Sequence, residues 1–192
     1  MTGKKELLQL LSLYNEHFPN ESGRLSRYTT FLHDTDGDML IARSNFNGHI
    51  TTSAFIIDGA ASRMLLLQHK SLGRWLQPGG HAEEQDASLL TSALREAVEE
   101  TGIRPDQLTY YPIHPVALVP FDIDAHYIPA NPKKQEDGHY HYDHRYLFIY
   151  TGEHDNQYDP AESTGMRWVS FTDLAGDATF GAMVQKISSQ VQ

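Results

Sequence analysis

The stretch from residue 86 to residue 103, DASLLTSALREAVEETGI, most limits what this chain can fold into. Its apolar residues recur at spacings of three and four, the period of an amphipathic helix. We expect a helix from about Asp86 to Thr101, because Gly102 and Pro105 follow as stop signals. One side of this helix is apolar and must be buried; it is formed by Leu89, Leu90, Ala93, Leu94, Ala97 and Val98.

Segments with the pattern of β-strands lie on both sides of this helix. They are residues 50–58, 63–70, 110–120, 121–128, 139–150 and 166–170. Pro78, Gly79 and Gly80 interrupt regular structure just before the helix and allow the backbone to approach a ligand closely. Short helices are expected at 171–176 and 179–190. Strands with interspersed helices predict an α/β or α+β sandwich.

The N-terminal segment has the pattern of two further helices. Its apolar residues at helical spacing are Leu7, Leu10, Leu11, Tyr14 and Phe18, then Leu25, Tyr28 and Leu32 after the break PNESG. We interpret residues 1–42 as an N-terminal helical extension that docks on a main domain of residues 43–192. A lid or a dimer contact is the alternative. Residues 33–39 are expected to form a loop.

Composition excludes several classes of function. The 192 residues include no cysteine, which rules out disulfides and thiol chemistry and makes the cytoplasm the default location. A formal net charge of −10 argues against a basic surface for nucleic acid. No apolar run is long enough to span a bilayer, and polar residues interrupt the first leucines, so a signal peptide is not expected. A phosphate ligand would need a metal ion to offset the repulsion.

The acidic residues Glu96, Glu99 and Glu100 occupy unusual positions on the expected helix. Glu96 and Glu100 are four apart and project to the edge of the apolar stripe, whereas solvated acids would lie opposite it. Glu99 and Glu100 also oppose the helix dipole, although Arg95 can pair with Glu99. Clustered carboxylates without cysteine suit a hard ion such as Mg²⁺ or Mn²⁺. The alternative is an ordinary solvated helix end.

This stretch resembles the Nudix box of the Nudix hydrolase family. The second half of the family pattern matches in full, at Arg95, Glu96, Ala97, Glu99, Glu100, Gly102 and Ile103. The first half has one residue more than the family spacing between Gly80 and Arg95, and Ala87 stands at the glutamate position. We expect Asp86 to replace that glutamate, with Glu83 and Glu84 as the alternatives.

The resemblance covers roughly residues 45–176, including GMRWVSFTDL at 165–174. It implies the Nudix fold, a mixed sheet between helices, and metal-dependent hydrolysis of a diphosphate bond in a nucleoside diphosphate linked to another moiety. Mg²⁺ or Mn²⁺ would be the cofactor, and a homodimer is the expected assembly. By position, Glu96 and Glu100 correspond to metal ligands and Glu99 to a ligand or water-activating base. Arg95 would orient the glutamates, and the Gly80 carbonyl would contact the metal.

A second group of polar residues lies within two neighbouring strand segments. In an extended strand alternate residues share a face, which groups Asp122, Asp124 and His126, and likewise His139, His141 and Asp143. Paired as a hairpin, these strands would present all six side chains together. They form either a metal or phosphate site that binds substrate or the solvated face of a sheet.

Two further residues are candidates for the same cleft. Glu136, in the loop of the expected hairpin, is the candidate downstream acid, and His81 is expected to face the cleft directly after Gly80. Histidines elsewhere, such as His17 and His33, are interpreted as surface residues.

Two rival functions follow from the same resemblance. Isopentenyl-diphosphate isomerase has a similar fold, but its chemistry uses a cysteine, which this chain lacks. A non-catalytic Nudix-like module that binds or senses a nucleotide is the other alternative. Such modules lose box glutamates, whereas this chain keeps all three on the helix.

Overall fold

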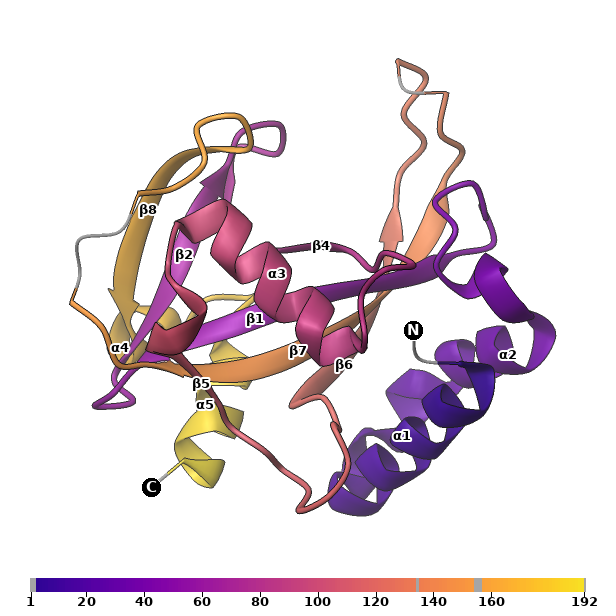
Figure 1. Ribbon diagram of the computed structural model, residues 1–192, viewed down its shortest axis with the longest axis horizontal. Coiled ribbons are helices and arrows are strands. Elements are labelled where there is room, and N and C mark those ends of the chain that lie inside the picture. Colours follow the sequence, from indigo (N-terminus) through magenta and orange to yellow (C-terminus); the bar gives the residue numbers. More distant parts are fainter. Residues whose placement is uncertain (1–2, 134, 154–156, 192) are drawn as a thin grey trace. The chain divides into compact units, whose positions relative to one another are not determined.

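The computed structural model describes residues 3–133, 135–153 and 157–191 (Figure 1). The chain forms two compact units. The first comprises Met1–Ser53, Gly79–Glu96 and Pro112–Tyr146, and the second comprises Ala54–Pro78, Ala97–Tyr111 and Leu147–Gln192. Three elements have residues in both units, namely β1 (His49–Asp58), α3 (Leu89–Thr101) and β7 (His139–Tyr150). The strands hydrogen-bond in the order β3 (Arg74–Leu76), β2 (Arg63–His69), β1, β7 and β5 (Leu108–Tyr110). Off this path, β4 (Gly79–His81) pairs with β1, β6 (Asp122–Ile128) with β7, and β8 (Ser163–Ser170) with β2.

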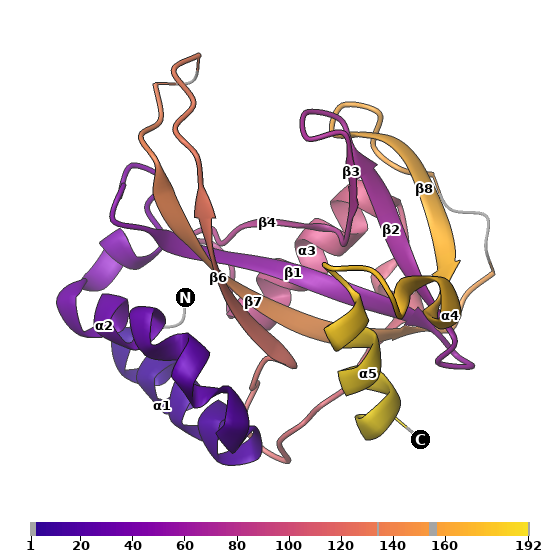
Figure 2. The ribbon, with the colours of Figure 1, turned by 180° about the vertical axis from the view of Figure 1, so that it is seen from behind.

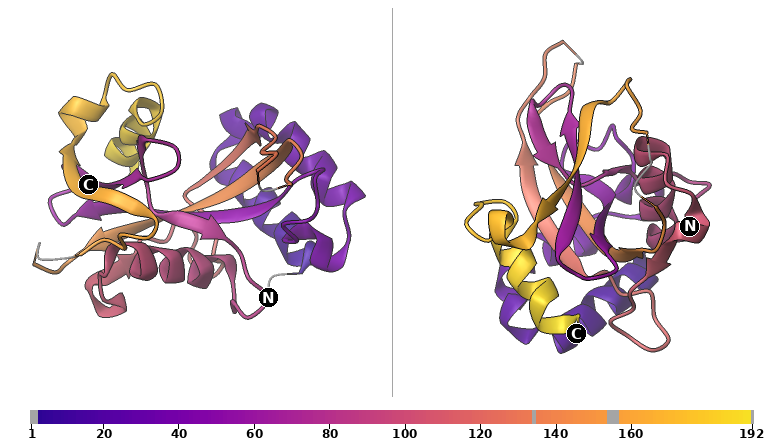
Figure 3. Two further views of the ribbon diagram at one scale, coloured as in Figure 1. Left: turned by 90° about the horizontal axis from the view of Figure 1, so that it is seen from above. Right: turned by 90° about the vertical axis from the view of Figure 1, so that its left-hand side faces the viewer.

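The first unit begins with the two expected N-terminal helices. They are α1 (Lys4–His17) and α2 (Ser26–Asp34), joined by the 3₁₀ helix η1 (Pro19–Leu25). Both lie beside the hairpin of β6 (Asp122–Ile128) and β7 (Figure 3). Tyr28 packs its ring against Tyr142 and bonds the buried His144 through a 2.8 Å contact between hydroxyl and Nε2. The expected loop at 33–39 is only partly correct, because α2 continues to Asp34 and η2 (Gly37–Leu40) follows.

The second unit contains β2 (Arg63–His69), β3 (Arg74–Leu76), β5 (Leu108–Tyr110) and β8 (Ser163–Ser170), with η3 (Pro105–Gln107) before β5. β2 pairs antiparallel with both β3 and β8. The short helices α4 (Phe171–Leu174) and α5 (Gly181–Gln190) end the chain (Figure 2). α5 begins two residues later than expected, because the Asp177 carboxylate accepts the backbone N–H groups of Thr179 and Phe180 just before it.

The strand expected at 110–120 is wrong. β5 ends at Tyr110, and no strand follows before β6. The physical reason is proline. Pro112, Pro115 and Pro120 cannot donate a hydrogen bond to a neighbouring strand.

The helix α3 begins at Leu89 rather than Asp86. The Ser88 hydroxyl accepts the Thr91 backbone N–H at 3.1 Å and caps the helix there. The helix ends as expected, since Gly102 adopts a left-handed φ of 64° and donates to the Val98 carbonyl.

The buried stripe of α3 differs from the expected one by a rotation about the helix axis. Its fully buried residues are Leu89, Ser92, Ala93, Ala97 and Thr101, whereas Leu90, Leu94 and Val98 are only half-buried. The rotation brings Glu96 toward the buried side, and its side chain is only 13% exposed. Among the described residues, no helix has both the length and the apolar content needed to cross a bilayer.

Candidate active site

The centre of the candidate site is Arg95, which the first unit holds from several sides. Its Nε and Nη2 donate to Oδ1 and Oδ2 of Asp86, each at 3.1 Å. Nη2 also donates to the backbone carbonyl of His81 at 3.0 Å. A two-pronged ion pair of this kind fixes the plane of the guanidinium group. The arginine therefore has one defined orientation.

Asp86 is the partner that sets this orientation. It is 8% exposed and also accepts the Glu83 backbone N–H at 2.9 Å. Burial by itself raises the pKa of Asp86, but the hydrogen bonds from Arg95 and from the Glu83 N–H outweigh it and lower the pKa below its usual value. The carboxylate is therefore ionised at neutral pH. Asp86, Glu83 and Glu84 are the candidates to replace the first glutamate of the box. Glu84 is exposed, and Glu83 meets Asp86 through its backbone, so it is the Asp86 side chain that reaches Arg95.

Glu96 is held between Arg95 and the backbone of Gly80. Arg95 Nη1 donates to Glu96 Oε1 at 2.9 Å. A Cβ atom added at Gly80 would lie 2.5 Å from the same oxygen, closer than real atoms approach. Gly80 belongs to β4 (Gly79–His81) and pairs with Thr52 of β1, whose hydroxyl bonds Ser92 of α3 at 2.9 Å. A carboxylate and a bare stretch of backbone therefore adjoin each other.

The other two box glutamates also lie on α3. Glu99 is exposed and Glu100 is half-buried, one helical turn after Glu96. The Glu100 carbonyl accepts the Asp159 backbone N–H at 3.0 Å, which ties the end of the helix to the loop that precedes β8. Their assignment as ligands and base stays a prediction.

The hairpin places the six predicted polar residues on one face. In the register of β6 with β7, Asp124 lies opposite Asp143 and His126 opposite His141. Asp122, Asp143 and His139 are all buried, which is inconsistent with a solvated face.

The acidic half of this face is neutralised by Arg145, a residue that the sequence analysis did not select. Its three nitrogens donate to Asp143 at 2.9 Å, Asp122 at 3.2 Å and Asp124 at 2.8 Å. Asp143 also accepts the Ser53 hydroxyl at 2.8 Å. The aspartates are therefore committed to an internal network. Alternation from Asp143 could have indicated Arg145, since it shares that face.

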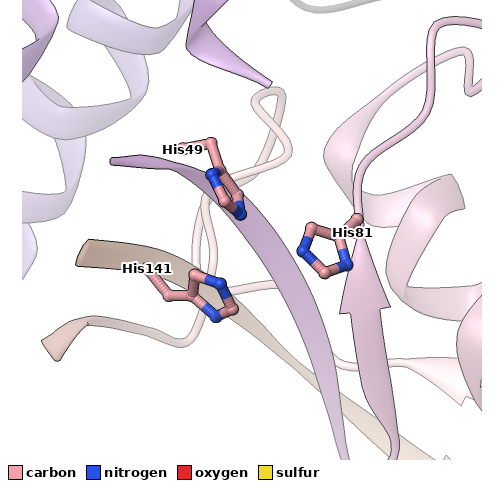
Figure 4. Close-up of side chains that lie close together, drawn as sticks. All are labelled: His49, His81 and His141. Atoms are coloured by element: carbon pink, nitrogen blue, oxygen red, sulfur yellow. The ribbon is translucent and has the colours of Figure 1, made fainter. Parts of the chain in front are cut away.

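The histidine half of the face joins histidines from two other strands. The rings of His139 and His141 lie 4.8 and 4.7 Å from the ring of His49 on β1, and His81 on β4 lies 5.0 Å from His49. Figure 4 shows His49, His81 and His141 turned toward one another. His126 lies 5.6 Å from His141 and bonds Asp124 through Nδ1 at 2.9 Å.

His49 was missed by the sequence analysis. It starts the strand HITTSAFIID, where it resembles an ordinary strand end, and only the pairing of β1 with β4 brings it to His81. The signal that could have found it is alternation, since His49, Thr51 and Ser53 share the face that meets Asp143.

Burial makes two of these rings neutral at pH 7. Burial is the main reason that the pKa of His49 falls to about 4, with His139 as the next contributor. Burial and then the neighbouring His49 and His81 lower the pKa of His141 to about 2. Glu136, whose backbone pairs with Asn131, is close enough to His49 to raise its pKa slightly. The predicted downstream acid is therefore near the histidines.

The family model described as NUDIX domain matches residues 47–186. No curated protein matches. A Nudix-family hydrolase from Clostridium perfringens has 23% identity and a TM-score of 0.58, covering 75% of this chain and 98% of its own. A C. elegans Ap4A hydrolase in a binary complex has 21% identity and a TM-score of 0.54, with coverage of 73% and 95%.

A third solved structure is the E. coli dihydroneopterin triphosphate pyrophosphohydrolase, with 17% identity and a TM-score of 0.55, covering 74% of this chain and 94% of its own. At such identities the structures establish the fold alone. The mixed sheet with helices expected from the sequence is therefore confirmed as the Nudix fold. Since the family model spans most of the residues, the chain belongs to the Nudix hydrolase family, whose enzymes cleave acid anhydrides in phosphorus-containing compounds.

Proposed function

We propose that this chain hydrolyses a diphosphate bond in a nucleoside diphosphate linked to another moiety, with Mg²⁺ or Mn²⁺ as cofactor. The observation that carries the proposal is the arrangement of Glu96. Its carboxylate is fixed by Arg95, which Asp86 fixes in turn, against the bare backbone of Gly80. This arrangement holds hard oxygen donors in place before any ligand arrives.

The donor chemistry fits a hard divalent ion. Glu96, Glu99 and Glu100 on α3 and the Gly80 carbonyl would hold it, and all of these donors are oxygens. When bound, the ion would neutralise diphosphate oxygens and lower the pKa of a water molecule. The net charge of −10 supports this requirement, because the chain would otherwise repel a polyanionic substrate.

The residues of the chain have separate tasks in this proposal. Arg95 restricts Glu96 to one rotamer, so that the carboxylate loses little freedom on binding. Glu99 is exposed at the surface of α3 and can accept the proton of the attacking water. Water adds across the P–O–P bridge, and two phosphate-containing products leave. Asp86 acts through Arg95, so we assign it a positioning role rather than substrate contact.

The experiment is a substrate panel with Mg²⁺ and, separately, Mn²⁺. The panel comprises Ap4A, ADP-ribose, nicotinamide dinucleotides, nucleotide sugars, coenzyme A, nucleoside triphosphates and dihydroneopterin triphosphate. Release of a phosphate-containing product from at least one of them is expected. No turnover of any compound by folded protein would instead favour a nucleotide-binding module.

The variant Glu100→Gln tests the residues, because it keeps the shape of the side chain and removes its charge. We expect a fall in kcat of at least about tenfold for loss of a charged group that acts on the reacting phosphate. Glu6→Gln, on the exposed surface of α1, is the matched control and should retain full activity. Full activity of Glu100→Gln would contradict the metal assignment.

A further inference from the structure

Three histidines from three different strands form a compact group that the proposed hydrolysis does not use. We call His49, His81 and His141 the imidazole cluster. One ligand atom from each ring lies within 4.8 Å of the others. The rings come from β1, the end of β4 and β7, and Figure 4 shows them converging on a common space.

His49 carries the strongest indication that something binds there. It is 1% exposed, yet neither ring nitrogen has a hydrogen-bond partner among the described residues. The Asn45 backbone raises the pKa of His49 as a weak hydrogen bond would, but the contact does not meet hydrogen-bond geometry. Leaving a buried polar group unpaired costs about 1–3 kcal/mol, and native proteins rarely accept this without a purpose. The ring is aimed at other imidazoles instead.

The hydrogen bonds of His139 determine which nitrogen of His141 is available. His139 Nδ1 lies 2.7 Å from the Asp137 carbonyl, which can only accept, so Nδ1 carries the proton. In the neutral ring Nε2 of His139 then accepts, and His141 Nε2 donates to it across 3.2 Å. This leaves Nδ1 of His141 with a free lone pair. The bond to His139 thus fixes the tautomer of His141, as an outer partner does in known metal sites.

We propose that the imidazole cluster binds a divalent transition metal ion, with Zn²⁺ as the expected ion. Imidazole nitrogens suit Zn²⁺, Cu²⁺, Ni²⁺ and Fe²⁺, whereas Mg²⁺ and Mn²⁺ prefer oxygen donors. Three histidines complete three of four tetrahedral positions and leave one open to water or to an oxygen of a ligand. This donor set is separate from the carboxylates of α3.

The spacing of the rings agrees with this assignment if the three rings move slightly closer together. A Zn–N bond of about 2.0–2.1 Å sets nitrogens about 3.3 Å apart in a tetrahedral site. The ligand atoms of the cluster lie within 4.8 Å. Binding therefore requires the rings to approach by at most about 1.5 Å, which side-chain rotation can supply.

The test is metal binding by untagged protein, stripped with a chelator and assayed without nucleotide. Calorimetry with Zn²⁺ should show one site per chain, and a large excess of Mg²⁺ should not displace the ion. His49→Ala and His141→Ala should each weaken binding by at least about tenfold, since removal of even an outer partner of a ligand costs this much. His33→Ala removes an exposed imidazole outside the cluster and should leave the affinity unchanged.

A spectroscopic measurement on the wild-type chain removes the dependence on variants that could fail to fold. Cu²⁺ loaded at one equivalent should give an electron paramagnetic resonance spectrum with splitting from several imidazole nitrogens. A spectrum of oxygen ligands alone would overturn the proposal. So would wild-type Zn²⁺ affinity in folded His49→Ala and His141→Ala. Because neither readout involves turnover, these results are independent of whether the chain hydrolyses a diphosphate.

Discussion

Replacement of Asp86 by alanine is the most direct test of whether Asp86 replaces the first glutamate of the Nudix box. The substitution removes both prongs of the ion pair with Arg95 and the acceptor of the Glu83 N–H. A hydrogen bond to a charged group contributes about 1.5–3 kcal/mol. Arg95 keeps its contacts with Glu96 and the His81 carbonyl and is 22% exposed, so its charge is not left buried without a partner. We therefore expect a loss of about 3 kcal/mol in the free energy of unfolding.

For a domain of this size, 3 kcal/mol corresponds to a fall in Tm of about 6–12 °C. Calorimetry or circular dichroism at pH 7 measures it. Catalysis should fall as well at a temperature where the variant is folded, because Arg95 without Asp86 is less firmly oriented and holds Glu96 less precisely. The loss should appear in kcat more than in KM, since Asp86 acts on orientation.

The controls are the two neighbouring acids. Glu83→Gln keeps the backbone N–H that bonds Asp86, and Glu84→Gln alters an exposed side chain, so both should behave as wild type. An unchanged Tm and kcat in Asp86→Ala, together with lost activity in Glu84→Gln, would refute the reasoning and move the front carboxylate to Glu84.

Three other predictions concern the first unit. Gly80→Ala places a Cβ 2.5 Å from Glu96 Oε1, so the carboxylate must move away and metal-dependent activity should fall, while stability should change little because only the end of a side chain is displaced; a wild-type titration with Mg²⁺ would contradict this. Arg145→Leu leaves three carboxylates without their common cation and should cost about 3–5 kcal/mol in urea unfolding. Arg104→Leu, which breaks an exposed pair, should leave the urea midpoint essentially unchanged. Asp124→Asn tests pH dependence. Burial raises the pKa of Asp124, but His126 and Arg145 lower it to about 2 from 3.8. The stabilisation that ionised Asp124 gives the folded state is therefore present above pH 4 and is lost as the pH falls toward 2. The difference in Tm between wild type and Asp124→Asn should shrink over that interval, and a difference independent of pH would exclude the mechanism.

The elements that the sequence predicted well are those with a strong local period. The hairpin segments 121–128 and 139–150 correspond closely to β6 and β7, and the two N-terminal helices form as expected. In each, one face carries most of the buried apolar side chains, so the pattern is repeated along the element. The strand expected at 110–120 has apolar residues but three prolines, and the missing donors outweigh the hydrophobicity.

The site was predictable where it is local in sequence. Arg95 and the three glutamates of the box helix lie within six residues, and Asp86 was selected by its distance from Gly80. What could not be predicted is contact across strands. Alternation alone places Arg145 on the face of Asp143, but its contacts with Asp122 and Asp124 on the other strand depend on the register of β6 with β7. His49 is the same case, since the proximity of its strand to His81 depends on how β4 pairs.

β4 contributes to both of the proposed metal sites, through opposite faces of one short strand. Side chains alternate between the faces of a strand, so Gly80 and His81 point in opposite directions. Gly80 meets the Glu96 carboxylate, and His81 meets His49 and His141. Oxygen donors thus gather on one face of β4 and nitrogen donors on the other. Oxygen donors suit a hard ion and imidazole nitrogens a borderline ion, so the two proposed sites differ in the metal they prefer. The carbonyl oxygen of His81 accepts from Arg95. The three adjacent backbone atoms of His81, from this oxygen to Cα, therefore link the oxygen donors around Arg95 directly to the imidazole cluster.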